Sequence, residues 1–183
     1  MRILSLLLLL VCLPVSAAEY GIVDAGKSSL AFTYRQMGVP VDGSFAKFTA
    51  SMRFDPARPA AAKAAIDVDL ASIDTGSPEG NDEVAGKQWF DTKNHPVAHF
   101  VSTAVKPLGG NRFELDGKLT MKGRTHDVGG QFTYAPRGSS AAFDGDLVIK
   151  RADFAIGEGE WADFDTVANE VRIKFHILAM ARK

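Results

Sequence analysis

Apolar and polar residues alternate along most of this chain, and the most regular alternation lies between residues 111 and 134. Phe113, Leu115, Leu119 and Met121 fall on one face of that stretch, while the charged and polar residues between them fall on the other. A period of two is that of a β-strand with one dry and one wet face. The pattern therefore predicts a strand whose apolar side faces a protein interior.

The alternation stops at Gly123 and resumes on its far side. Glycine readily adopts the positive φ that a tight reversal needs. Beyond the break, Val128, Phe132 and Tyr134 continue the apolar positions. The two halves thus predict a β-hairpin with one shared apolar face.

The same period recurs elsewhere and predicts roughly eight strands in all. Residues 38–40 interrupt it, since they contain a glycine and a proline. The other apolar strand positions are Leu30, Phe32 and Tyr34; Phe48, Ala50, Met52 and Phe54; Ile66, Val68 and Leu70; Ala98 and Phe100; Ala141, Phe143, Leu147 and Ile149; and Val171, Ile173, Phe175 and Ile177.

Two segments lack the alternation. Residues 77–94 are polar and contain Gly80 and Gly86, so we expect a short helical insertion there, with Asp82 as a candidate cap. Residues 157–168 form a predicted acidic loop.

Eight strands with one dry face each favour a closed antiparallel barrel, because closure removes the unpaired edges of an open sheet. A two-sheet sandwich would satisfy the same pattern and stays an alternative. Many large aromatic residues on the dry faces favour the barrel, with residues 77–94 as a cover for its mouth.

Residues 1–18 have the pattern of a cleaved secretory signal peptide. Arg2 gives a positive start, an apolar run follows, and small residues precede a cut after Ala17 or Ala18. Residues 19–183 are then one exported domain. Cys12 belongs to the signal, so the mature chain has no cysteine for a disulfide or a thiolate.

The charge is nearly balanced, with 21 basic and 22 acidic residues. This balance gives no indication of nucleic-acid binding. The histidines, His95, His99, His126 and His176, show no pattern that fixes a convergent metal site. We therefore predict no metal, no cofactor and no catalytic residues.

Several short motifs occur in order along the chain: Asp24 to Phe32, Gly43 to Phe48, Ile73 to Gly76, Trp89 to Asp91, His95 to Thr103, Gly117 to Val128 and Lys150 to Gly157. Together they resemble the motifs of the YceI-like family of exported lipocalin-like barrels. The run Asn81 to Asp91 departs from the family, because it lacks the usual arginine and leucine, so a head-group contact by that arginine is not carried over.

The resemblance implies an apolar tunnel that holds a long isoprenoid chain, of the polyprenyl phosphate or quinone type. The predicted lining residues are Phe32, Tyr34, Phe48, Met52, Phe100, Phe113, Leu115, Leu119, Met121, Phe132, Tyr134, Phe143, Leu147 and Phe175. Three further residues, Arg151, Trp89 and Trp161, are candidates for the rim or a head-group contact. The alternatives are an ion pair between Arg151 and the acidic loop, and tryptophans that only anchor loops.

These observations predict a periplasmic lipid carrier with no nucleic-acid partner. The alternative is an accessory subunit of a membrane b-type cytochrome or quinone redox system. Such a subunit would make transient contact with the membrane. The acidic loop with Trp161 resembles that of family members associated with membrane b-type cytochromes. A lipid hydrolase is a third reading, which no nucleophile motif supports.

Overall fold

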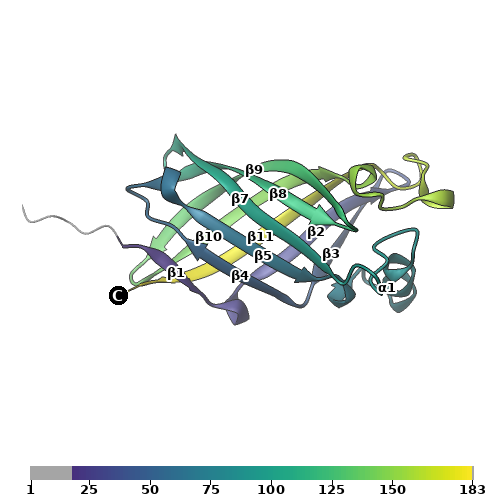
Figure 1. Cartoon of the computed structure of the whole chain (residues 1–183), viewed down its shortest axis with the longest axis horizontal. Coiled ribbons are helices and arrows are strands. Elements are labelled where there is room, and N and C mark those ends of the chain that lie inside the picture. The colour runs from purple at the N-terminus through teal and green to yellow at the C-terminus, as the bar shows by residue number, and fades with distance from the viewer. Residues whose placement is uncertain (1–17, 183) are drawn as a thin grey trace, which may run out of the picture.

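The computed structural model describes residues 18–182, which form one long sheet curled around a central axis (Figure 1). The predicted signal peptide lies outside these residues, apart from Ala18. Eleven strands belong to the sheet. They are β1 (Tyr20–Val23), β2 (Ser29–Gln36), β3 (Val39–Phe45), β4 (Phe48–Arg53), β5 (Lys63–Asp69), β6 (Ile73–Asp74), β7 (Val97–Gly109), β8 (Arg112–Met121), β9 (Arg124–Arg137), β10 (Ser140–Lys150) and β11 (Glu170–Ala181).

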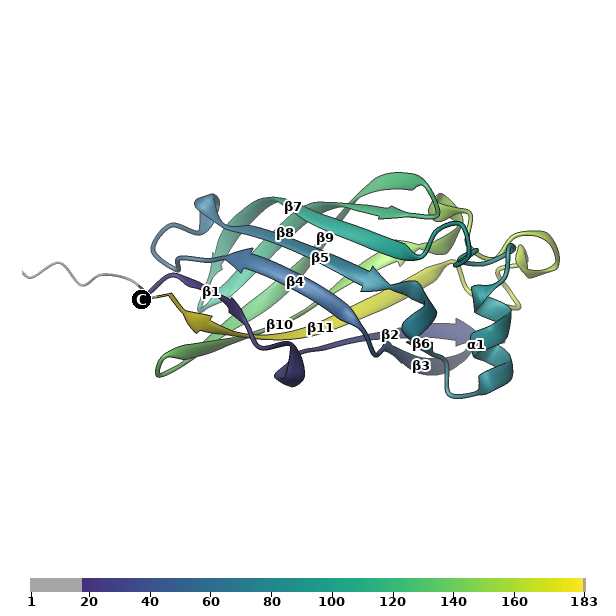
Figure 2. The same ribbon diagram turned by 60° about the horizontal axis from the view of Figure 1, so that its bottom comes forward.

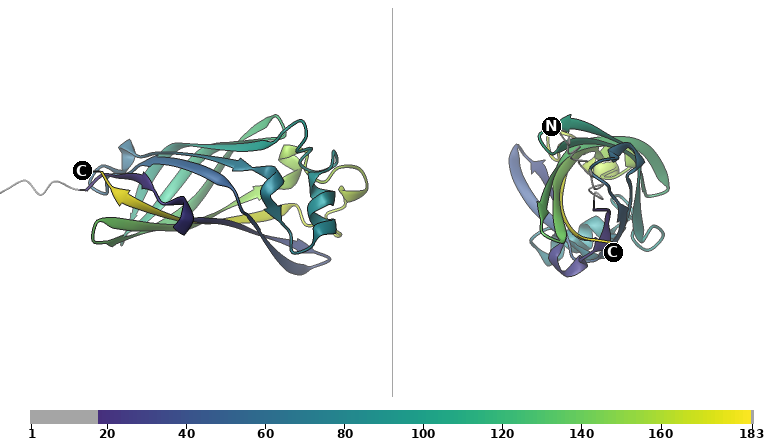
Figure 3. Two further views of the ribbon diagram at one scale, coloured as in Figure 1. Left: turned by 90° about the horizontal axis from the view of Figure 1, so that it is seen from below. Right: turned by 90° about the vertical axis from the view of Figure 1, so that its left-hand side faces the viewer.

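The strands follow the order β4-β5-β7-β8-β9-β10-β11-β2-β3-β6, and every pairing is antiparallel. β1 lies outside this order and pairs with β11. Tyr20 of β1 also bridges to Phe54 at the end of β4, so β1 links two distant parts of the sheet. Seen end-on, the strands surround a central space (Figure 3). The predicted antiparallel barrel is confirmed, and a single continuous sheet excludes the two-sheet sandwich.

The predicted hairpin is formed by β8 and β9. Lys122 and Gly123 connect the strands with φ values of 46° and 72°, the left-handed pair that a two-residue hairpin turn requires. Phe113 faces Phe132 across the pair, and Leu119 faces His126. The shared apolar face of the hairpin points into the barrel, as the alternation predicts.

Three strands were not predicted, namely β1, β3 and β6. β3 includes Pro40, which lies in the predicted break at residues 38–40. Pro40 pairs with Arg35 near the exposed tip of the β2–β3 hairpin, whose turn is Met37-Gly38. Proline is tolerated there because its missing N–H costs little near the end of a strand pair.

One α-helix, α1 (Pro78–Ala85), lies across the end of the barrel away from the termini (Figure 2). Ser77 caps it by accepting a hydrogen bond from the Gly80 N–H at 3.0 Å, so the cap is Ser77 and Asp82 lies inside the helix. No residue of α1 is buried. Within residues 18–182 we find no helix with the length and apolar character needed to cross a bilayer.

Five short 3-10 helices connect the strands: Ala25–Lys27, Pro59–Ala61, Leu70–Ser72, Arg151–Phe154 and Gly159–Trp161. The last two belong to a connection that lies at the same end of the barrel as α1 (Figure 1). β1 and the C-terminus lie at the opposite end. We call these the mouth end and the closed end.

Candidate functional site

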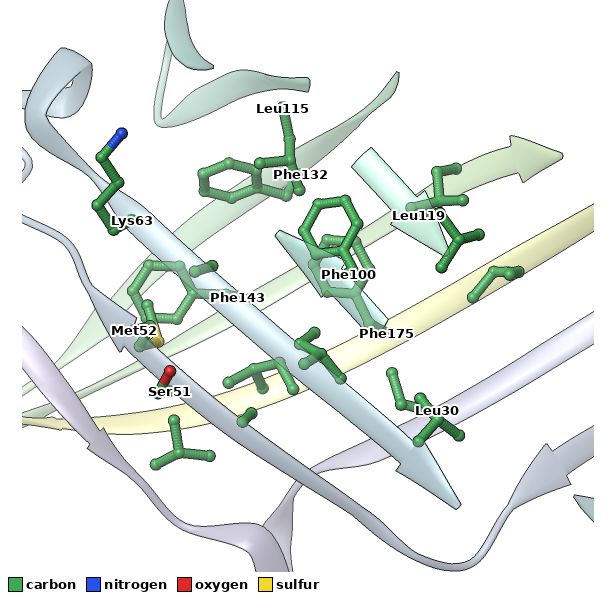
Figure 4. Close-up of a pocket in the computed structure, with 18 of the residues that line it drawn as sticks. Leu30, Ser51, Met52, Lys63, Phe100, Leu115, Leu119, Phe132, Phe143 and Phe175 are labelled. Carbon is green, nitrogen blue, oxygen red and sulfur yellow. The ribbon is translucent and has the colours of Figure 1, made fainter. Parts of the chain in front are cut away.

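An apolar cavity of about 140 Å³ lies inside the barrel and is called the inner cavity here (Figure 4). Its wall is contributed by most of the strands, and Phe100, Phe132 and Phe143 come from β7, β9 and β10. The predicted residues that line it are Met52, Phe100, Leu115, Leu119, Met121, Phe132, Phe143, Leu147 and Phe175. The volume is roughly ten times what one water needs.

A second cavity, of about 380 Å³, lies at the mouth end and is called the mouth cavity. Its apolar wall includes Phe32 and Tyr34 from β2 and Val84 from α1. Its polar lining residues are Gln36, Thr75, Ser77, Glu83 and Arg151, joined by the indoles of Trp89 and Trp161. The mouth cavity thus differs from the inner cavity in carrying polar groups on one part of its wall.

The two cavities adjoin. Phe45, Met121 and Ile173 line both of them. These three residues come from β3, β8 and β11 and lie at the boundary between the cavities. An elongated molecule could extend from the mouth into the barrel only by passing between these side chains.

Three of the predicted lining residues border neither cavity, namely Phe48, Phe113 and Tyr134. Phe113 stacks on Phe132 at 5.2 Å between ring centroids and meets the edge of Phe54 at the same distance. These contacts fill the closed end with aromatic rings. Phe113 and Tyr134 do point into the barrel, as the alternation predicts. They lie in packed core, however, and not in the wall of a cavity.

Tyr134 is held in that core by its hydroxyl, which donates to the Tyr20 hydroxyl at 3.1 Å. Desolvation by the surrounding rings, together with this hydrogen bond, raises the pKa of Tyr134 well above its ordinary value. The neutral phenol is therefore the stable form in the folded protein.

Some cavity-lining residues outside the predicted set come from the strands that were not predicted. Phe45 and Val41 lie in β3, and Ile73 lies in β6. Phe45 and Val41 do alternate with polar residues, as do the recognised strands. The signal was present in the sequence but was obscured by Pro40.

Arg151 begins the 3-10 helix that follows β10 and is only 2 % exposed. Its Nη1 donates to the carbonyl oxygens of Ile156 and Gly157 at 2.9 and 2.7 Å. Its Nη2 donates to the carbonyls of Trp161 and Val167, both at 2.7 Å. Nε donates to Val167 and Ala168 at 3.3 and 3.2 Å.

These contacts correct one expectation about Arg151. No carboxylate within residues 18–182 forms an ion pair with it; its donors go to the backbone of the acidic loop instead. Burial lowers the pKa of the guanidinium from its ordinary value. Because the guanidinium nitrogens of Arg151 already donate to backbone carbonyls, this side chain holds the mouth wall together. A ligand head group could bind Arg151 only by displacing one of these carbonyls.

The two tryptophans pack against each other in the mouth wall, with ring centroids 5.5 Å apart. Trp161 Nε1 donates to Glu83 Oε1 at 2.8 Å and so connects the acidic loop to α1. Trp89 is 9 % exposed, and its Nε1 is buried without a hydrogen-bond partner among the described residues. A buried donor left unpaired costs about 1–3 kcal/mol, so this indole is a notable feature of the mouth.

The histidines do not converge. His99 and His176 pair with Asp67 and Asp144 on the outer face, while His126 packs edge-on against Phe154 at 5.1 Å. Over residues 18–182, no three potential metal-ligating His, Cys, Asp or Glu side chains form a group. Ser102 is buried and accepts a hydrogen bond from the Ala64 N–H at 2.8 Å, a structural contact.

Comparison with known proteins supplies the wider context. The family model of the YceI-like domain matches residues 22–179. A UPF0312 protein of Pseudomonas putida strain GB-1 is 30% identical over 166 residues, which is 86% of this chain and 86% of that protein. A UPF0312 protein of Azotobacter vinelandii is 30% identical over 148 residues, covering 76% of this chain and 77% of the relative.

Solved structures have the same architecture. The crystal structure of Burkholderia cenocepacia BcnA superposes with a TM-score of 0.84 at 48% identity, covering 86% of this chain and 99% of BcnA. A polyisoprenoid binding domain from Saccharophagus degradans superposes with a TM-score of 0.68 at 18% identity, covering 91% of this chain and all of that one. The latter likeness concerns the fold alone.

Proposed function

Because the chain belongs to the YceI-like family, we propose that it binds and carries a lipophilic molecule, a long-chain isoprenoid or a similar lipid, in its two adjoining cavities. The observation that carries the proposal is that an apolar inner cavity adjoins a partly polar mouth cavity. That arrangement matches a molecule with a long hydrocarbon chain and a polar end. The polyisoprenoid binding domain of Saccharophagus degradans, which has this fold, supports the choice of ligand class.

The affinity of such a carrier comes from burial of the chain and requires no chemical step. Apolar surface removed from water contributes roughly 25 cal/mol per Å², from which the cost of ordering the flexible chain is subtracted. The inner cavity supplies apolar surface on all sides, from Leu30 and Phe175 to Phe100. The protein would then release the chain unchanged, and we expect no turnover of ester or phosphate substrates.

The direct test is native mass spectrometry, with solvent extraction, of protein purified from its own cell envelope. We expect a non-covalently bound lipid that extraction removes. A blocked variant makes the test specific: Ala50→Trp places an indole in the inner cavity, which Ala50 lines from β4. Thr49→Trp on the exposed face of the same strand is the matched control.

The expected result is loss of the lipid from Ala50→Trp and its retention by Thr49→Trp, with both variants folded. Equal lipid content in the two variants would contradict binding in the inner cavity. Absence of lipid from the parent, combined with failure to take up any polyprenyl probe, would contradict the carrier function itself.

Export belongs to the same proposal. The pattern of residues 1–18 supports delivery to the periplasm with removal of a signal peptide. Intact-mass measurement on the envelope fraction should show a chain that begins at Ala18 or Glu19. An uncut chain confined to the cytoplasm would contradict export.

A second candidate is an accessory subunit of a membrane b-type cytochrome or quinone redox system. The observation in its favour is a group of exposed apolar side chains at the mouth end: Met37 is 77% exposed, Val39 62% and Phe164 49%. The Met37 N–H donates to the Thr166 carbonyl at 2.9 Å, which joins the hairpin tip to the acidic loop. Co-purification with a membrane cytochrome that Met37→Ser and Phe164→Ser abolish would support this function.

A further inference from the structure

The inward face of β2 changes from apolar to polar along the strand. Leu30 lines the inner cavity (Figure 4). Phe32, Tyr34 and Gln36 follow it at intervals of two and line the mouth cavity. Residues two apart on a strand point to the same face of the sheet. From the barrel interior to the mouth, one strand thus presents an aliphatic chain, a phenyl ring, a phenol and a carboxamide.

The hydroxyl of Tyr34 forms no hydrogen bond with another described residue, yet it is not sealed in the core. Its ring lies beside Phe32, with ring centroids 6.2 Å apart, and the side chain is half-buried. The hydroxyl oxygen itself keeps accessible surface. Burial raises the pKa of the Tyr34 phenol, so the group stays protonated at neutral pH. It is therefore a donor with room for a partner.

Gln36 lies nearer to the outside, and its backbone is held in place. It bridges to Val167 in the acidic loop, and the adjacent Met37 N–H donates to the Thr166 carbonyl at 2.9 Å. The side chain of Gln36 lines the mouth cavity, is exposed and forms no hydrogen bond with the described residues. A carboxamide both donates and accepts, so this group can contact many kinds of polar head.

Other polar side chains of the mouth cavity hold parts of the fold together. Ser77 caps α1. Thr75 Oγ1 donates to Asn81 Oδ1 at 2.8 Å, and Glu83 accepts from Trp161 Nε1 at 2.8 Å. The two polar side chains of β2 hold no other element in place. The fold itself therefore does not account for a phenol and a carboxamide on the inward face of this strand.

The mouth wall also carries the buried positive charge of Arg151. Neutral backbone carbonyls satisfy the hydrogen bonds of its guanidinium but do not cancel its charge. The Glu83 carboxylate in the same wall is exposed, so water screens it more strongly than it screens the buried cation. The charge of Arg151 thus favours oxygen atoms with partial or full negative charge in this cavity.

We propose that the Tyr34 hydroxyl donates a hydrogen bond to an acceptor oxygen at the polar end of the ligand, and that the Gln36 carboxamide contacts the same head group. The ligand is then a prenyl lipid whose head carries acceptor oxygens, which a quinone and a phosphate both provide. The inference rests on the proposed function, because it assigns the head-group contacts of the same lipid site. Tyr34 and Gln36 are specificity-determining residues, and the inner cavity binds the chain without them.

The test compares three molecules with the same prenyl chain: a geranylgeranyl benzoquinone, geranylgeranyl phosphate and the hydrocarbon without a head. Their affinities are measured by competition with a fluorescent polyprenyl probe, for the lipid-free parent and for Tyr34→Phe, which removes only the hydroxyl. Tyr134→Phe is the matched control. The Tyr134 hydroxyl is bonded to Tyr20 in the packed closed end, and the residue borders neither cavity.

Tyr34→Phe should weaken binding of the quinone about three- to ten-fold, the range that one neutral hydrogen bond provides. It should weaken binding of the phosphate about ten-fold or more, because hydrogen bonds to a charged acceptor are stronger. The affinity for the hydrocarbon should stay unchanged, and Tyr134→Phe should leave all three affinities unchanged. Comparing each head with the hydrocarbon in the same variant removes any general effect on binding of the chain.

Gln36→Leu tests the second contact. It should lower the affinities for the quinone and the phosphate, relative to that for the hydrocarbon, by about three-fold or more. Gln131→Leu is the control, since Gln131 is exposed on β9 and lines neither cavity. Unchanged ratios in Gln36→Leu would remove Gln36 from the proposed head-group site.

A spectroscopic measurement separates a hydrogen bond from a packing effect. The chain has three tyrosines, so ¹³C labelling of the tyrosine Cζ atoms gives three signals, and Tyr34→Phe assigns one of them. Bound quinone or phosphate should shift the Tyr34 signal further than the bound hydrocarbon does. The signals of Tyr20 and Tyr134 should not distinguish the three molecules.

The proposal on Tyr34 would be overturned by unchanged affinities for both heads in Tyr34→Phe, by an equal loss for all three molecules, or by a Tyr34 signal that is the same with all three. A loss confined to the quinone or to the phosphate would support it and identify the head that the mouth receives. Where the proposal fails, binding of the hydrocarbon by the parent would leave the carrier function standing. Failure of the parent to bind any of the three molecules would reject both.

Discussion

Tyr20 and Phe54 exchange two backbone hydrogen bonds, Tyr20 N–H to Phe54 O at 2.8 Å and Phe54 N–H to Tyr20 O at 2.9 Å. This pair joins the first strand of the domain to the end of β4, which otherwise pairs only with β5 in the sheet order. It also brings the two rings into the aromatic cluster at the closed end. Phe54 lies within 5.2–6.0 Å of the rings of Phe113, Phe132, Tyr134 and Phe143.

A substitution in the packed closed end and a similar substitution in the cavity wall should lower the free energy of unfolding by different amounts. Phe113→Ala should lower the free energy of unfolding by about 3–5 kcal/mol, because it opens a void in packed aromatic core. Phe175→Ala should cost clearly less, because Phe175 already borders the inner cavity. Denaturant unfolding of lipid-free protein measures both.

Binding of a fluorescent polyprenyl probe should show the reverse order. Phe175→Ala removes part of the cavity wall and should weaken binding, while folded Phe113→Ala should bind as the parent does. Equal stability losses accompanied by equal affinities would mean that the inner cavity is packed core in solution.

Arg151 provides a second prediction. Arg151→Lys keeps the charge but loses the planar fork that reaches the carbonyls of Gly157, Trp161 and Val167. We expect a loss of about 3 kcal/mol or more, since several buried carbonyls are left without their charged donor. Differential scanning calorimetry on the lipid-free protein measures the effect.

Lys150→Met is the control, because the neighbouring Lys150 is exposed. It should change stability by no more than about 0.5 kcal/mol. Hydrogen exchange in Arg151→Lys should accelerate mainly in residues 156–168. Unaltered exchange there would show that the guanidinium does not organise the loop.

The buried phenol of Tyr134 predicts a pH dependence at the alkaline side. Since the folded state raises its pKa above the unfolded value of about 10, the folded protein holds the phenolic proton more tightly. This contribution to stability is complete below pH 10 and is lost as the pH rises from there towards the folded pKa.

The measurement is the free energy of unfolding between pH 9 and pH 11 for the parent and Tyr134→Phe. The parent should lose stability more steeply, because the phenylalanine has no proton to lose. Parallel curves would indicate that Tyr134 titrates in the folded state as it does in the unfolded chain.

The helix at the mouth predicts uneven local stability. α1 has no buried residue and contains a glycine, Gly80, whereas β8 is hydrogen-bonded to a strand on each side. Amide exchange should therefore be fast in Pro78–Ala85 and slow in residues 118–121. Equal protection in the two segments would argue against a mobile cover over the mouth cavity.

The alternation of apolar and polar residues predicted which face of the sheet each side chain lies on, but not which other side chains it contacts. Phe113 and Phe143 have the same inward phase, yet Phe143 lines the inner cavity and Phe113 does not. Both rings pack on Phe54 with centroids 5.2 Å apart, and Phe113 in addition stacks on Phe132 across the hairpin. A period of two along one strand carries no information about such neighbours.

Arg151 shows a similar limit. Its position at the end of a strand beside an acidic loop suggested an ion pair, because side-chain charges are visible in a sequence. Its actual partners are backbone carbonyls, which every residue has and which only the path of residues 156–168 brings together. The unpaired indole of Trp89 was equally invisible, since pairing depends on the final packing.

The pairing of β1 with β11 has a mechanical consequence. Tyr20 lies opposite Ala181, so the two ends of the domain are neighbours, and the Arg182 N–H donates to the Glu19 carbonyl at 2.7 Å. A force that pulls these ends apart acts across the strands and loads their hydrogen bonds one after another. The barrel should therefore yield by unzipping from the closed end at low force, and a surface attached to either terminus would leave the mouth facing outward.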